Sequence, residues 1–383
     1  MNLFDAVVEK DKMNPNFLTI QKDLYIRNVL NDWCDGFIDR DGKFVKEFQI
    51  TFNSSFWEIY CYAVFKEMAF NIDLSKDRPD FVLSLNQENL NIECVVANNA
   101  DNMPPEWTYL EKVNSNYTLD ERVYHQVLRI LNAIDGKRTK YLKNYSQLEY
   151  VKNEPFIIAL HPFDQAQFMD VNQEAIRLSL FGWNCDKATY EDRFFDIVKK
   201  NENAQLNMGV FTNSSCAEVS GVLFSTVATT GKARAFSKTP AVMFQNMRYN
   251  PDAKKPLLSI NVMFNNIPNS QKSTYLKYVK AYASKFKSEL NHNQYSCRKP
   301  FIEEGYQETI TDGLHLYINP YAINPISNKQ IELFKNHNIQ IHTCLKENNF
   351  DVDSFLTPYH LIQRRVWIGN PFLDKITPNK KLL

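Results

Sequence analysis

The stretch from Ser55 to Val96 reads SFWEIYCYAVFKEMAFNIDLSKDRPDFVLSLNQENLNIECVV, and it decides the fold. Ser55 to Phe70 contains neither Gly nor Pro, and its apolar residues recur at spacings of three and four, which is the pattern of a helix with a buried face. Three short strand-like runs follow, at residues 71–75, 81–85 and 90–96. The stretch therefore predicts one helix followed by three strands.

Three carboxylates lie on these predicted elements: Glu58 on the helix, Asp80 at the start of the second strand and Glu93 inside the third. A carboxylate on an apolar strand is costly to bury unpaired, so we expect Glu93 to meet a metal ion, another cation or water. If the last two strands pair, Asp80 and Glu93 converge on one cation. Oxygen ligands of this kind suit Mg²⁺ or Mn²⁺. We expect Glu58, Asp80 and Glu93 to be metal ligands, with raised pKa values when no metal is bound.

The order of these pieces resembles the PD-(D/E)xK, or restriction-endonuclease-like, nuclease superfamily. Pro79-Asp80 corresponds to the first half of the motif and Glu93-Cys94-Val95 to the second, and the resemblance covers about residues 51 to 162. It implies an α/β fold with a mixed central sheet flanked by helices. It also implies metal-dependent hydrolysis of phosphodiester bonds in nucleic acid, with Mg²⁺ or Mn²⁺ as the cofactor.

One position departs from the family pattern: Val95 stands where the family has its lysine. An apolar side chain cannot stabilise the charge of a transition state, so a cation from elsewhere is needed if the site cleaves phosphodiesters. The next predicted helix, from Asp120 to Ala133, carries Gln126 and Arg129 one turn apart, and these are the first candidates. Lys137 and Lys140 come second because they follow the predicted helix end. The candidate catalytic residues are Asp80, Glu93, Gln126 and Lys140.

Other interpretations of the same residues stay open. Ser55-Phe-Trp-Glu58 is also a capping box, in which Glu58 only satisfies backbone donors at a helix start. Asp80 after a proline also suits an ordinary turn before a strand. At the level of the whole protein, the alternatives are a nucleic-acid-binding or scaffold protein that keeps the nuclease fold without its chemistry, and an unrelated α/β enzyme.

The rest of the chain suggests elaborations around this core. Residues 1–50 form an accessory segment, with a predicted helix from Asp23 to Asp35 and a predicted hairpin from Phe37 to Ile50, turning at Asp41-Gly42. The nuclease-like core spans residues 51–165. Residues 166–383 form a C-terminal α/β region that can pack on the core as one unit.

Composition bounds the partners and the setting. The 44 basic and 44 acidic residues balance, so any attraction to nucleic acid must come from a local patch. No run of 18 apolar residues exists, and the seven cysteines have no CxxC spacing, which favours a soluble, cytoplasmic protein without a membrane partner. Nucleic acid is the expected partner, DNA before RNA, in a host-defence or restriction setting by analogy. A homodimer, or a partner protein in a larger system, is also compatible with the sequence.

Overall fold

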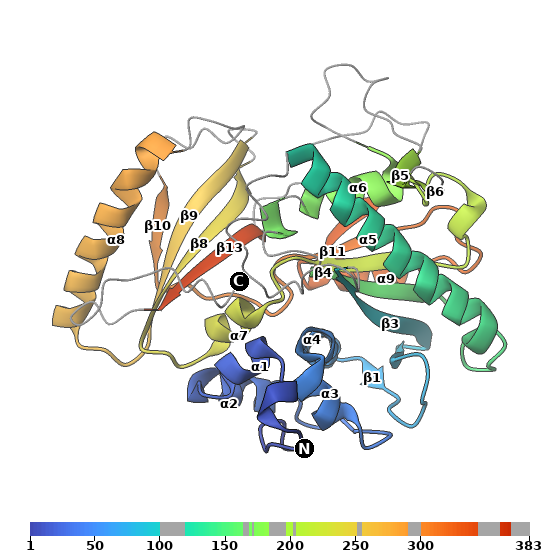
Figure 1. Ribbon diagram of the computed structural model, residues 1–383, viewed down its shortest axis with the longest axis horizontal. Coiled ribbons are helices and arrows are strands. Elements are labelled where there is room, and N and C mark those ends of the chain that lie inside the picture. The colour runs from blue at the N-terminus through green and yellow to red at the C-terminus, as the bar shows by residue number, and fades with distance from the viewer. Residues whose placement is uncertain are drawn as a thin grey trace.

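The structure is a computed structural model that describes residues 1–99, 119–163, 168–170, 172–183, 197–201, 204–250, 255–289, 300–343 and 361–368. It is a mixed α/β fold built on a large mixed sheet with helices against both faces (Figure 1). A second, four-stranded sheet stands beside it (Figure 1).

The large sheet has the strand order β1-β2-β3-β4-β7-β11-β12. Its strands are β1 (Asn71–Ile72), β2 (Phe81–Leu85), β3 (Glu88–Asn98), β4 (Phe156–Phe163), β7 (Gly221–Ser225), β11 (Leu314–Ile318) and β12 (Gln340–Thr343). The hairpin of β2 and β3 is antiparallel, and β3, β4 and β7 run parallel to one another. The predicted helix-strand order from α4 to β4 is confirmed, and it places parallel strands at the centre of a mixed sheet.

Two helices pack on opposite faces of this sheet: α4 (Phe52–Glu67) and α5 (Leu119–Lys140). Side chains along β3 point alternately to the two faces of the sheet. Those of Ile92, Cys94 and Val96 join the hydrophobic core around α4. Val95 instead packs against the apolar residues of α5. The helices therefore cover the hairpin from both sides, which is what positions the acidic residues.

The regular elements of the N-terminal segment are all helices, and none is a hairpin. It comprises a 3₁₀ turn (Lys10–Lys12), α1 (Pro15–Ile20), α2 (Leu24–Trp33) and α3 (Phe44–Ile50). The helix predicted from Asp23 is confirmed, with Asp23 accepting bonds from the first turn of α2. The predicted hairpin is wrong, because Phe44 and Phe48 are four residues apart and bury together on one face of a helix.

The second sheet has the order β10-β9-β8-β13. Its strands are β8 (Ala241–Asn250), β9 (Lys255–Phe264), β10 (Phe301–Glu304) and β13 (Leu361–Ile368). Helix α8 (Asn269–Glu289) covers its outer face, and α7 (Thr230–Phe236) lies between this sheet and the N-terminal helices (Figure 1).

The remaining elements lie on or beside the large sheet. They are a π-helix (Tyr141–Tyr145), α6 (Asn172–Phe181), the hairpin of β5 (Ile197–Asn201) and β6 (Ala204–Asn207), α9 (Asn328–Asn336) and two 3₁₀ turns (Phe168–Asp170 and Ser214–Cys216). Among the described residues, no helix combines the length and apolar character that crossing a membrane requires.

Candidate active site

Asp80 and Glu93 face one another across the antiparallel pair of β2 and β3. Because Phe81 pairs with Ile92, Asp80 lies one residue before β2 and directly opposite Glu93. Residues opposite each other in such a pair point to the same face of the sheet. The backbone N–H of Cys94 donates to Asp80 Oδ2 over 2.7 Å, which fixes one oxygen of that carboxylate. Glu93 is fully buried.

Two lysines of α5 converge on one oxygen of Glu93. Nζ of Lys137 lies 2.7 Å and Nζ of Lys140 lies 2.8 Å from Glu93 Oε1. A spacing of three residues puts both lysines on the same side of the helix, so a single helix face supplies both charges. Both lysines therefore pair with a residue on the same strand face as Val95.

A tyrosine completes the shell around the same oxygen. The Tyr145 hydroxyl donates to Glu93 Oε1 over 3.3 Å, and its ring lies 5.3 Å from Nζ of Lys140. Tyr145 ends the π-helix that continues α5, and such wide turns are frequent at functional sites. Tyr145 could not be found from a local sequence signal, because a π-turn has no simple sequence pattern.

The charges around Glu93 set its protonation. Burial alone would raise the pKa of Glu93, but the ammonium groups of Lys137 and Lys140 outweigh burial and hold that pKa below its ordinary value. Burial likewise opposes the charged form of Lys137, and the carboxylates of Glu93 and Asp80 reverse the effect and raise the pKa of Lys137. Glu93 and Lys137 therefore remain charged at neutral pH. The expectation that the pKa of Glu93 would be raised is wrong, because the ammonium groups of Lys137 and Lys140 stabilise its charged form.

The other two carboxylates behave as expected for acids crowded together. Burial, and then the charge of Asp80, raise the pKa of Glu58 to about 8, although Arg40 nearby opposes this shift. Burial and the charge of Glu93 raise the pKa of Asp80 to about 6. Glu58 therefore retains its proton at neutral pH in the metal-free protein. Arg40, which sequence reasoning missed, also donates to the backbone oxygen of Asp80 over 3.3 Å.

The capping-box interpretation of Glu58 is wrong. Helix α4 begins at Phe52 with Thr51 as its N-cap residue, so Glu58 lies in the second turn and its side chain is not at the helix start. Its position is instead within the electrostatic reach of Asp80 and Glu93, whose charges both raise its pKa.

Gln126 and Arg129 are not brought to this cluster. The Gln126 amide nitrogen donates to the backbone oxygen of Phe168 over 3.4 Å, and Arg129 donates to that of Asn98 over 2.7 Å. Gln126 precedes Lys137 by three helical turns, or about 16 Å along the axis. The preference for the first half of this helix over Lys137 and Lys140 is therefore not matched by the geometry.

Whether the carboxylates fit a divalent cation can be judged from their free oxygens. Glu93 Oε2 is buried and has no hydrogen-bond partner among the described residues, which suits a cation that would neutralise it. Asp80 and Glu93, which face one another across the hairpin, are the pair that would hold such an ion. Within the same described part of the chain, however, no group of three or more His, Cys, Asp or Glu is already arranged to hold a metal ion.

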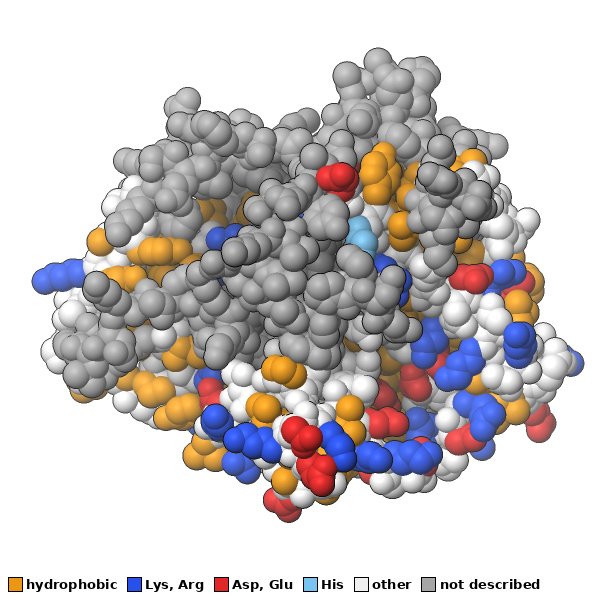
Figure 2. All heavy atoms as spheres, in the orientation of Figure 1, with side chains coloured by type: hydrophobic (Ala, Val, Ile, Leu, Met, Phe, Trp, Pro, Cys, Tyr) orange, Lys and Arg blue, Asp and Glu red, His pale blue; other side chains and the backbone are white. Residues whose placement is uncertain are grey.

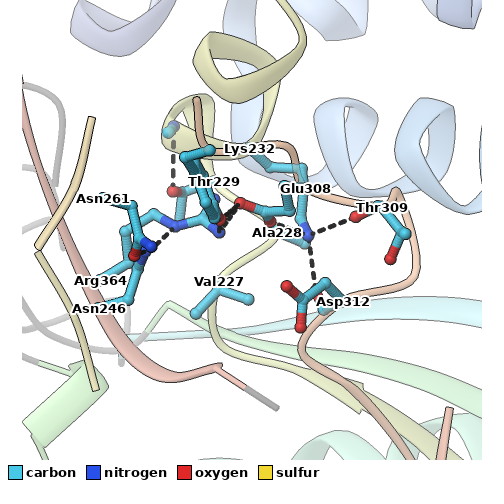
Figure 3. A network of polar contacts seen from close by, with 12 residues as sticks. Val227, Ala228, Thr229, Lys232, Asn246, Asn261, Glu308, Thr309, Asp312 and Arg364 are labelled. Carbon is cyan, nitrogen blue, oxygen red and sulfur yellow. Dashed lines mark hydrogen bonds and ion pairs between the residues drawn. The ribbon is translucent and has the colours of Figure 1, made fainter. Parts of the chain in front are cut away.

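A second charged cluster lies where α7 meets the four-stranded sheet (Figure 3). Lys232 and Arg364 each form an ion pair with a different oxygen of Glu308. Nζ of Lys232 also donates to the backbone oxygens of Asp312 over 2.6 Å and Thr309 over 3.3 Å. A phosphate-binding role for Lys232, at the end of the short TTGK run, is thereby excluded: its ammonium group is fully buried and bonded to protein.

Comparison with known proteins adds no assignment: the chain matches no family model, no curated protein and no solved structure.

Proposed function

We propose that this protein is a metal-dependent nuclease, hydrolysing phosphodiester bonds of nucleic acid with a restriction-endonuclease-like core. The observation that carries this proposal is the convergence of Lys137 and Lys140 on Glu93, opposite Asp80. The hairpin supplies the carboxylates and α5 supplies the ammonium groups. The cluster therefore contains cations although Val95 occupies the motif position of the lysine.

Each residue has a distinct part in this proposal. Asp80 and Glu93 would hold Mg²⁺ or Mn²⁺, with Glu58 as a further acidic group, and the cation would supply Lewis-acid activation of the phosphodiester. Lys137 is only 21% exposed at its side chain and keeps Glu93 charged and in place. Lys140 is 47% exposed and can turn towards a bound phosphate, where an ammonium group offsets developing negative charge.

Proton release accompanies metal loading. The pKa of Glu58 is raised to about 8, so a divalent cation that binds beside it must displace its proton at neutral pH. The pKa of Asp80 is raised to about 6, so the cation competes with protons for Asp80 only at lower pH. Binding is therefore expected to strengthen as the pH rises through this range.

A second function is favoured by one specific observation. The two ammonium groups already neutralise Glu93 without any metal, which is the arrangement expected of a nuclease fold that has lost its chemistry and only binds nucleic acid. The two functions are told apart by cleavage: only the nuclease cleaves nucleic acid, and its cleavage requires both Glu93 and a divalent cation.

The test is a plasmid cleavage assay with Mg²⁺ or Mn²⁺ that compares wild type, Glu93→Gln and Glu88→Gln. Glu88 is a matched control, because it begins the same strand but contacts Lys329 on the surface. We expect wild type and Glu88→Gln to cleave, and Glu93→Gln to lose at least about 10²-fold in rate. If wild type cleaves neither DNA nor RNA with either metal, the proposed nuclease function is contradicted and the nucleic-acid-binding function is favoured.

A further inference from the structure

Helix α8 concentrates positive charge in a chain whose total charge is zero. Its 21 residues include five lysines, and no acidic residue precedes its last position, Glu289. By contrast, α5 mixes both signs of charge, and its lysines pair with Glu93. A neutral protein attracts a polyanion only through such a local excess.

The packing of α8 fixes which way these lysines point. Tyr275, Val279 and Ala283 are spaced by four residues and bury against the four-stranded sheet. Lys277 and Lys280 are exposed on the other side of the helix. Among the described residues neither of these lysines has an ion-pair partner, whereas both Lys329 and Lys335 of α9 do.

Unpaired like charges one turn apart destabilise a helix slightly, so this arrangement costs stability within the protein. The cost is removed when an anionic partner binds. Two ammonium groups at this spacing can contact neighbouring phosphates along one strand of a nucleic acid.

A lipid surface fits this helix poorly. Interfacial helices insert large apolar side chains such as Leu, Phe and Trp beneath their basic residues. None of the large apolar side chains that are exposed in the described residues lies on α8. Tyr278 and Tyr282 are only half-buried, but they stack on one another with ring centres 6.5 Å apart.

We infer that the outer face of α8, defined by Lys277 and Lys280, is a second nucleic-acid contact that binds the phosphate backbone without reading sequence. In Figure 1 this face lies at the far left, on the opposite side of the molecule from the end of α5 that carries the candidate active site. Of the described side chains drawn along that left edge in Figure 2, none is acidic. The inference rests on the proposed function for the class of partner, and it does not depend on cleavage.

The experiment measures binding of a 30-bp DNA duplex by fluorescence anisotropy in EDTA, at several KCl concentrations between about 0.05 and 0.3 M. The variants are Lys277→Gln with Lys280→Gln, and, as a matched control, Lys329→Gln with Lys335→Gln on α9. Each double variant removes the same two charges from exposed helix positions. Thermal unfolding of each variant checks that the fold is intact.

We expect the α8 variant to bind about three- to tenfold more weakly at about 0.1 M salt, and its log Kd against log salt slope to fall by about 2. The α9 control should keep the wild-type affinity and slope. An unchanged slope in the α8 variant, an equal loss in the control, or absent duplex binding by wild type would overturn the inference. Binding of wild type to phosphatidylserine vesicles but not to duplex would also overturn it.

The design separates this inference from the proposed function. Binding is measured without divalent metal, so a protein that binds through α8 but never cleaves leaves the inference standing and removes the nuclease. Conversely, a protein that cleaves while its α8 variant binds normally removes only the inference.

Discussion

Two clusters in this protein place a glutamate between two cationic side chains, and they differ in how far solvent reaches them. Around Glu308, the side chains of Lys232 and Arg364 are at most 1% exposed. Around Glu93, those of Lys137 and Lys140 are 21% and 47% exposed.

The clusters also differ in their balance of acids. The two cations overcome burial and hold the pKa of Glu308 at about 2, so this carboxylate is permanently charged. Around Glu93 two further acids remain, and the pKa values of Glu58 and Asp80 are raised to about 8 and about 6. A closed cluster with its charges satisfied joins parts of the fold. A cluster with surplus carboxylates and reachable cations is the kind that we propose binds a divalent cation and a substrate.

The largest expected effect of this difference is on stability. Glu308→Gln leaves two buried cations without a counter-charge and should lower the free energy of unfolding by about 3–5 kcal/mol. Glu93→Gln should cost less than about half as much, because Lys140 can turn to water. Urea denaturation of both variants at pH 7 measures the two values, and equal losses would break the comparison.

The next effect is a pH dependence that comes from Glu58. Between about pH 4.5 and pH 8 the folded protein holds a proton on Glu58 that the unfolded chain releases, so metal-free stability should fall as the pH rises through this window. Glu58→Gln should remove about 2 kcal/mol of this fall in the free energy of unfolding. The value is smaller than the full pKa shift implies, because Glu58 is partly exposed to solvent. Denaturation in EDTA at pH 5 and pH 8 measures it.

Divalent metal should reverse this trend. Saturating Mn²⁺ is expected to stabilise wild type more at pH 8 than at pH 6, because protons compete with the cation at lower pH. Equal Mn²⁺ stabilisation at both values, or stabilisation that persists in an Asp80→Ala, Glu93→Ala double variant, would contradict the metal site.

The smallest expected effect belongs to Tyr145. Tyr145→Phe keeps the ring beside Lys140 and removes only the hydroxyl that donates to Glu93 over 3.3 Å. We expect a loss of about 1 kcal/mol or less in stability and of less than about tenfold in cleavage rate, with KM unchanged. Urea denaturation and steady-state kinetics measure both, and a rate loss larger than that of Lys140→Ala would assign Tyr145 a more direct part.

Much of the core could be predicted from the sequence, because its periodicities are local. The order of the periodic segments predicted a mixed sheet with two helices on its faces. The expected pairing of the second and third strands predicted that Asp80 and Glu93 would converge, and the two residues do lie opposite one another. Which basic residue contacts Glu93 could not be predicted from the local sequence pattern. The apolar periodicity of α5 ends at Ile134, yet the helix continues through Gly136 to Lys140. The lysines of this last part, Lys137 and Lys140, both contact Glu93.

The N-terminal segment and the second cluster show the same limit. Asp41-Gly42 suits a hairpin turn, but the contact of Phe44 and Phe48 with the core makes the following residues a helix. The ion pairs of Glu308 join residues 56 and 76 positions away, and no local pattern reports such a separation.

The most direct test of the central claim is single-turnover cleavage of a duplex by wild type, Lys140→Ala and Lys143→Ala, at saturating Mg²⁺. Lys143 is the matched control: it is exposed and lies three residues beyond Lys140, and no contact with Glu93 is made by it. If Lys140 supplies the charge that Val95 cannot, its loss should slow cleavage by about 10²- to 10³-fold while Lys143→Ala stays within about threefold of wild type. Cleavage by Lys140→Ala at the wild-type rate would contradict the account.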